Sequence, residues 1–220
     1  MLKGVSFEQS NTILSLVSIA ENSNTKWQSN YNYIEDIGDG RGYTSNIVGF
    51  CTGTGDFLWF VEDLCKLDHK HKLCKYISAL KKVNGSSSHK GLKGLVNDVK
   101  HSNDSNYKKA TWNAINHFYW GPVIEKAKKY NISYPISLGQ MYDINLNMGS
   151  LKLVKPKGNQ TESQWLYHLQ KRWLNYITNK DHSLDDGQPD RALMWHSIRR
   201  NHNLTLPIKA QCYGDKFTIK

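Results

Sequence analysis

The sequence predicts a mainly α-helical protein with one small β-sheet. Apolar residues recur at helical spacing in most segments, as between Ile13 and Ala20. Capping boxes, which mark helix starts, begin at Ser6 and at Thr161. The run Tyr43–Phe50 is β-branched and aromatic, and it is expected to form a short strand. With 220 residues, the chain is long enough for one large domain or two small lobes with a real core.

The expected helices follow one another along the chain, each with an apolar stripe on one face. The first opens at Ser6 and reaches Glu21, and the others cover Gly55–Leu67, His71–Val83, Leu95–Tyr119, Pro122–Tyr130, Tyr134–Met148, a helix from Thr161 through Ile177, and Pro189–Arg200. Gly121 is the expected break before Pro122. The Gly/Ser-rich segment Ser86–Gly94 is the predicted hinge between two lobes. An acidic cluster of Asp181, Asp185, Asp186 and Asp190 fits either an Asp-rich turn or a wall of a substrate cleft.

Two carboxylates stand in contrasting surroundings. Asp39 lies between Gly38 and Gly40, in a run that must be a tight loop, and Arg41 follows two residues later. Glu21 is expected in the last turn of the first helix, where the helix dipole disfavours an ionised carboxylate. Such a pair suits a general acid and a general base. The alternative is a surface Glu at a helix end and an Asp in a turn.

The charge distribution favours a cationic partner for the glycine loop. The whole chain carries a net charge of +10, which alone would indicate a polyanionic ligand such as nucleic acid. The segment Tyr31–Leu64, however, has a net charge of −5, which leaves +15 on the remainder. An acidic patch of this kind suits a polycationic substrate, whereas the basic remainder suits an anionic polymer. Hydrophobic residues make up 39% of the chain, so the protein is globular rather than disordered.

The four cysteines leave their pairing open. Cys51, Cys65, Cys74 and Cys212 allow three full disulfide pairings, and free buried thiols are equally compatible with the sequence. The run from Cys65 to Cys74 also contains His69 and His71, which are possible zinc ligands. Its spacing is not a standard finger pattern, so a solvated basic turn is the preferred interpretation, and we expect no metal and no cofactor.

Asp143 falls within an apolar helical stretch and needs a partner if it is buried. Arg172 and Arg191, each on a later helix, are the candidate partners. The alternative is three unrelated surface charges.

Three stretches of sequence stand out, Ala20–Ser23, Tyr33–Thr44 and Gly49–Asp56, together with Trp27. In combination they resemble the signature of the family 46 chitosanases. A thinner similarity continues through Ala79–Ser86, Leu138–Gln140 with Tyr142 and Asp143, and Tyr213–Asp215. The resemblance implies an inverting glycoside hydrolase with a lysozyme-like fold. In that fold residues 1–220 form a single catalytic domain, with two mostly helical lobes flanking a substrate cleft and an Arg–Asp–Arg network joining the lobes behind it.

The resemblance also implies roles for the residues that match. Glu21 would be the general acid and Asp39 the general base. Thr44 would help to hold the attacking water, and Arg41 would orient Asp39 and keep it ionised. Tyr33, Glu35 and Asp56 would bind the substrate, with Tyr33 and Glu35 in the same wall of the site and Asp56 on the amino group of a sugar.

The expected activity is endo-hydrolysis of chitosan, a β-1,4-linked glucosamine polymer. Two alternatives are a muramidase- or chitinase-like hydrolase of an acetylated polymer and a non-catalytic binder of an anionic polymer. We expect a monomer with no nucleic-acid partner. We also expect no membrane partner, because no apolar run approaches 18 residues. The resemblance implies a secreted enzyme, although residues 1–5 do not have the pattern of a signal peptide.

Overall fold

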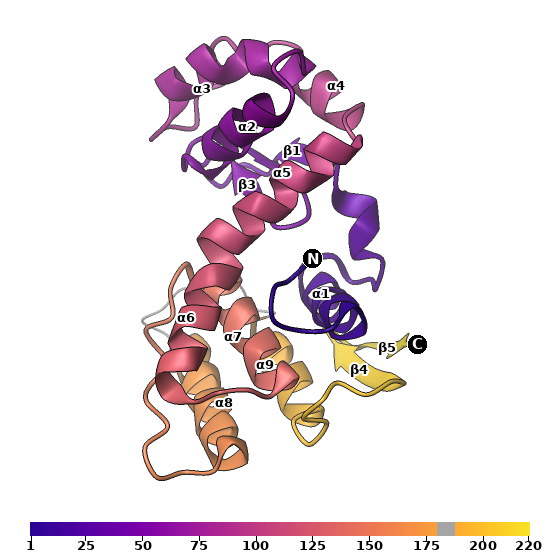
Figure 1. The fold of residues 1–220 in the computed structure, drawn as a ribbon, viewed down its shortest axis with the longest axis vertical. Helices are drawn as coiled ribbons and strands as arrows, with labels where there is room; N and C mark the ends of the chain where they lie inside the picture. Colours follow the sequence, from indigo (N-terminus) through magenta and orange to yellow (C-terminus); the bar gives the residue numbers. More distant parts are fainter. Residues whose placement is uncertain (180–187) are drawn as a thin grey trace. The chain divides into compact units, whose positions relative to one another are not determined.

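The computed structural model describes residues 1–179 and 188–220, which divide into two compact units. Unit 1 comprises Met1–Lys26 and Tyr119–Lys220, and unit 2 comprises Trp27–Phe118. Figure 1 shows that helices dominate each unit, so the predicted mainly α-helical fold is confirmed. No helix in these described ranges is both long and apolar enough to cross a membrane.

The predicted hinge is wrong. Ser86–Gly94 lies inside unit 2, and the chain passes between the units at residues 26–27 and 118–119. The segment instead forms the connection between two short helices of unit 2, α3 (Ile77–Val83) and α4 (Leu95–Lys100), and its glycines and serines suit the turns there. The acidic residues Asp181, Asp185 and Asp186 lie outside the described residues.

Unit 1 is built on α1 (Phe7–Asn22) and α7 (Pro135–Met148). The capping box is confirmed, because Ser6 and Gln9 each accept a backbone N–H hydrogen bond from the other. Residues 135–145 of α7 are all buried. A Cβ on Gly139 would come within 3.0 Å of Ile13 and Trp195, so the missing side chain allows the close approach of these neighbours.

Three more helices and a hairpin complete unit 1. The helices are α6 (Gly121–Tyr130), α8 (Glu162–Thr178) and α9 (Gln188–Ser197). The second capping box, at Thr161 and Gln164, opens α8 as predicted. Gly121 begins α6 rather than separating two helices, because the preceding turn, η3 (Asn116–Trp120), is a π-helix that runs directly into it.

The hairpin was not predicted. Strands β4 (Ile208–Cys212) and β5 (Asp215–Ile219) pair antiparallel around Tyr213 and Gly214, both of which have positive φ. Positive φ at both central residues is typical of a two-residue hairpin turn. The buried positions alternate in β4, and this period of two was the available sequence signal. The Tyr213 hydroxyl donates a hydrogen bond to the Ala20 carbonyl, which ties the hairpin to the end of α1.

Unit 2 contains a three-stranded antiparallel sheet in the order β1 (Ile34–Asp36), β2 (Tyr43–Ser45) and β3 (Phe50–Cys51). The prediction of a single strand over Tyr43–Phe50 is therefore corrected. A turn over residues 46–49 divides it, with positive φ at Asn46 and Gly49.

Helix α2 (Asp56–Leu67) packs against α5 (Ser105–Ile115), where Phe57, Phe60 and Tyr107 form an aromatic core. The helix predicted over 95–119 is broken into α4, α5 and η3. Asp104 explains the break, because its Oδ1 caps the start of α5 by accepting from two backbone N–H groups. The helix predicted over 71–83 is divided between η2 (Lys72–Tyr76) and α3.

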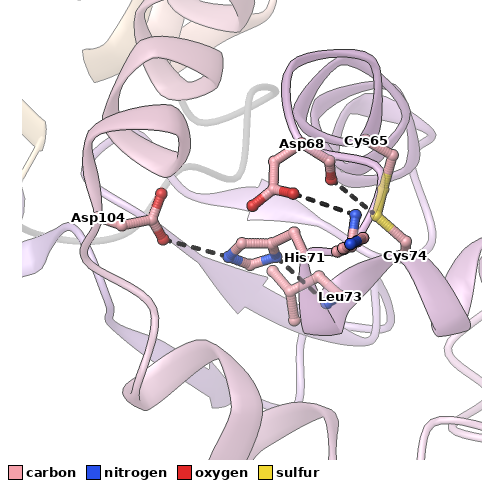
Figure 2. Close-up of a disulfide and its surroundings, with 7 residues drawn as sticks. Cys65, Asp68, His71, Leu73, Cys74 and Asp104 are labelled. Atoms are coloured by element: carbon pink, nitrogen blue, oxygen red, sulfur yellow. Dashed lines mark hydrogen bonds and ion pairs between the residues drawn. A yellow bond between two sulfur atoms is a disulfide. The ribbon is translucent and has the colours of Figure 1, made fainter.

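Figure 2 shows a disulfide between Cys65 and Cys74. Cys51 and Cys212 are free and buried. The zinc alternative thereby loses both of its thiolate ligands. His71 is buried beside this bond: its Nδ1 accepts from the Leu73 N–H, and its Nε2 lies 3.3 Å from Oδ2 of Asp104. The closed loop is thus fastened to the start of α5.

Replacing Cys65 and Cys74 together by Ser is expected to lower the free energy of unfolding by about 2–4 kcal/mol, because the unfolded chain loses a constraint. Urea unfolding measures this change. Dithiothreitol should weaken the wild type by a similar amount and leave the double variant unaffected. Equal midpoints for the oxidised and reduced wild type would contradict the prediction.

Candidate functional site

Glu21 lies in the last turn of α1, as predicted, with its side chain 45% exposed. The helix ends at Asn22 and is followed by Ser23, which takes a left-handed conformation. Sequence reasoning did not predict the contact that Glu21 makes. Oε1 of Glu21 lies 2.5 Å from Nη1 of Arg191, so a guanidinium opposes the effect of the helix dipole on this carboxylate.

Arg191 joins Glu21 to Asp143, a fully buried carboxylate on α7. Its Nε donates to Oδ2 of Asp143 at 3.0 Å, and its Nη2 donates to Oδ1. The indole N–H of Trp195 donates to the same Oδ2 at 2.7 Å. Burial opposes the charge of Arg191, but the two carboxylates outweigh it and raise the pKa of Arg191 well above its ordinary value. One arginine therefore stabilises two acids.

Arg172 does not belong to this cluster. Its Nε donates to the Leu153 carbonyl at 3.0 Å, and within the described part of the chain its buried Nη2 has no hydrogen-bond partner. The predicted Arg–Asp–Arg network is thus corrected to Glu21–Arg191–Asp143 with Trp195. All four residues belong to unit 1, so the cluster does not join the two units.

Asp39 lies on the loop that connects β1 and β2, where Gly38, Gly40 and Gly42 all have positive φ. A side chain at Gly42 would be strained and would meet Thr52, because a Cβ there would lie 2.4 Å from the threonine Oγ1. The loop is consequently held against the segment that follows β3. The N–H of Gly53 donates to the Arg41 carbonyl, and the N–H of Tyr43 donates to Oγ1 of Thr52.

Arg41 donates several hydrogen bonds to Asp39 from within the same loop. Its Nε and Nη2 donate to Oδ2 at 2.8 and 2.5 Å, and its backbone N–H donates to Oδ1 at 3.0 Å. These hydrogen bonds hold the pKa of Asp39 below its ordinary range. Asp39 is therefore an ionised, oriented carboxylate whose side chain remains 25% exposed. The sequence-based expectation for this pair agrees with the geometry.

The sheet brings three of the other candidates together. Thr44 is the cross-strand partner of both Glu35 and Cys51. Its Oγ1 lies 3.4 Å from the Cys51 sulfur, and burial raises the pKa of that thiol. The Tyr33 hydroxyl donates to Oε2 of Glu35 at 3.1 Å. Burial raises the pKa of Tyr33 most, and the hydrogen bond to Glu35 raises it further. Glu35 and Thr44 thus lie on the same sheet as the Asp39 loop, and Tyr33 directly precedes its first strand.

Asp56 is the first residue of α2 and shapes the turn before it. Its Oδ1 accepts hydrogen bonds from the backbone N–H groups of Cys51 and Phe57 and from the Thr54 hydroxyl. This arrangement gives Asp56 a structural role at the start of α2. Contact with a sugar amino group is a further role that stays a prediction.

A pocket of about 210 Å³ lies elsewhere in unit 1, between α8 and α9. Its described lining consists of Tyr167, Gln170, Lys171, Leu174, Ala192, Leu193 and His196. None of the residues predicted for the catalytic site is among them.

The sequence matches the model of glycosyl hydrolase family 46 over residues 15–205, a range that includes every candidate above. This chain belongs to glycosyl hydrolase family 46. A chitosanase of Streptomyces sp. strain N174 is 34% identical over 94% of this chain and 80% of its own length. The family assignment makes the chain a glycoside hydrolase, as the resemblance implied.

Solved structures of the family have the same fold. Native chitosanase from Bacillus subtilis MY002 matches with a TM-score of 0.87 and 26% identity, over 99% of this chain and 100% of that one. A mutant of that enzyme, solved in complex with six GlcN units, matches with the same score, identity and coverage. The lysozyme-like, mainly α-helical fold that the resemblance implied is therefore confirmed.

Proposed function

We propose that this chain hydrolyses chitosan at internal β-1,4 bonds with inversion, using Glu21 as general acid and Asp39 as general base. The observation that carries the proposal is the clamped, ionised Asp39 on its glycine loop, in a chain that belongs to family 46. Relatives that are named chitosanases, and a neighbour solved with glucosamine units, support the choice of substrate. Residues 1–220 would act as one catalytic domain.

In the proposed reaction, Glu21 gives its proton to the glycosidic oxygen while Asp39 takes a proton from water. The water attacks the anomeric carbon from the opposite face, which requires about 6.5–9.5 Å between the two carboxyl groups during the reaction. Glu21 can keep Oε1 as the acceptor for Arg191 and carry its proton on Oε2. The ion pair that fixes its side chain is then compatible with an acid role.

Substrate recognition would rest on the acidic character of the sheet and the start of α2. Tyr31–Leu64 carries a net charge of −5, and its carboxylates Glu35 and Asp56 would attract the ammonium groups of glucosamine. Thr44, buried beside Cys51, would hold the attacking water. The Cys65–Cys74 disulfide is typical of oxidising compartments and supports secretion. We further propose that the enzyme works as a monomer, without a nucleic-acid or membrane partner.

Reducing ends released from chitosan and from fully acetylated chitin test the substrate class. The proposal predicts release from chitosan and much less from chitin, because acetylation removes the cationic groups. Products from chitin alone would favour the alternative acetylated substrate. Binding to heparin without hydrolysis of either polymer would favour the anionic-polymer alternative.

The hydrogen bonds from Arg41 to Asp39 lead to a prediction about the pH dependence of kcat/KM. The base works only when it is ionised, so the acidic limb of kcat/KM lies where Asp39 becomes protonated. Arg41→Ala removes the hydrogen bonds that lower the pKa of Asp39 and should move this limb to higher pH. Arg41→Lys keeps the charge but loses the paired donors, so its limb should move less. A full pH–rate profile of both variants measures the shift, and an unmoved limb in Arg41→Ala would contradict the assigned role.

A further inference from the structure

We infer that His89 is a positioning residue for the loop that carries Asp39, an inference that rests on the proposed function. His89 belongs to the segment between α3 and α4, far in sequence from that loop. Its ring stacks on Tyr43, with 4.0 Å between ring centroids and 12° between planes. Its Nε2 is covered from solvent and lies 3.2 Å from Oδ2 of Asp36, which is an ion-pair distance for a protonated imidazole but does not have hydrogen-bond geometry.

The two residues that His89 contacts are the two ends of the Asp39 loop. Asp36 is the last residue of β1, Tyr43 is the first residue of β2, and the two are cross-strand partners. The six residues 37–42 between them include Asp39 and Arg41. The imidazole of His89 therefore contacts the last residue of β1 and the first residue of β2, where the loop leaves the sheet.

Asp36 extends this contact into the loop itself. Its Oδ1 accepts the backbone N–H of Gly38 at 2.9 Å, while its Oδ2 faces His89. The contacts thus run from His89 through Asp36 to Gly38, which directly precedes the proposed base. The far side of the loop is held separately, through the hydrogen bond from Gly53 to Arg41.

This loop depends on such contacts. Residues 37–41 are all exposed, and the loop contains three glycines with positive φ, so its ordered form costs more conformational entropy than that of most segments. Arg41 orients Asp39 only within the loop, because both residues move with it. An anchor outside the loop must fix the carboxylate relative to the sheet that bears Thr44. His89 supplies that anchor at the entry side.

The test compares His89→Ala, His89→Phe and Asp36→Asn with wild type, using His69→Ala, an exposed histidine of the same unit, as the matched control. Amide hydrogen exchange of residues 38–42 reports the loop directly, and chitosan hydrolysis gives kcat and KM. His89→Ala should speed exchange in this loop and lower kcat about 10-fold, with KM changed less than about twofold. His89→Phe keeps the stacking on Tyr43 and should recover part of the loss.

The two readouts separate this inference from the proposed function. Unchanged exchange in His89→Ala would overturn the positioning role, even if the activity fell. An equal effect of His69→Ala, or a uniform rise of exchange across unit 2, would also overturn it, since both indicate general destabilisation. A wild type that leaves chitosan intact would defeat the proposed function, whereas the exchange measurement would still decide the role of His89.

Discussion

Glu21→Gln and Asp39→Asn are each expected to lower kcat on chitosan by about 10²- to 10⁴-fold, the usual contribution of one general acid or base. Gln retains an acceptor oxygen for Arg191, and Asn retains one for Arg41, so both side chains can stay in place while losing their acid–base function. Thermal unfolding should change by only a few degrees. Initial rates of reducing-end release measure the effect.

Matched controls exist for both substitutions. Glu8 lies on the same helix as Glu21 and is exposed, and Asp68 is a loop carboxylate of unit 2 that accepts from its own local backbone. Glu8→Gln and Asp68→Asn should keep rates close to wild type. Near-normal turnover in Glu21→Gln or Asp39→Asn would sink the corresponding assignment.

The second large effect concerns stability. Arg191→Met should lower the free energy of unfolding by about 3–5 kcal/mol, because it leaves the carboxylate of Asp143 buried without its charge partner. For a chain of this size the corresponding fall in Tm is roughly 10 °C. Differential scanning calorimetry measures it.

Arg172→Met is the matched comparison, since the guanidinium of Arg172 donates to a backbone carbonyl and lacks a carboxylate partner within residues 1–179 and 188–220. It should cost less than Arg191→Met. Adding Asp143→Leu to Arg191→Met should restore part of the lost stability, because the unpaired charge is then removed. Equal losses in the two single arginine variants would show that the buried ion pair is not the cause.

The parts of the fold that sequence could predict are those fixed by local chemistry. Ser6 and Thr161 form their capping boxes within four residues, and the glycines around Asp39 require a loop wherever the chain goes. The predictions of one strand over 43–50 and of one helix over 95–119 were wrong for a related reason. A left-handed Asn46 and a capping Asp104 interrupt patterns that are otherwise periodic.

The parts that could not be predicted depend on contacts between distant segments. Both Arg172 and Arg191 lie on amphipathic helices, and only the packing of α9 shows that Arg191 meets Asp143 and Glu21. Nothing in the sequence distinguished Trp195 from the other tryptophans as a member of this cluster. The hinge was misplaced because a Gly/Ser-rich composition marks turns as readily as boundaries. Here the boundaries fall at residues 26–27 and within the π-helical turn 116–120.

The anomeric form of the first products tests the central claim most directly. Proton NMR during the first minutes of chitosan hydrolysis distinguishes the α from the β reducing end before mutarotation mixes them. If Asp39 activates a water opposite Glu21, the β-1,4 polymer should release α products first. Initial release of β products would indicate a retaining reaction and would contradict the roles proposed for both carboxylates.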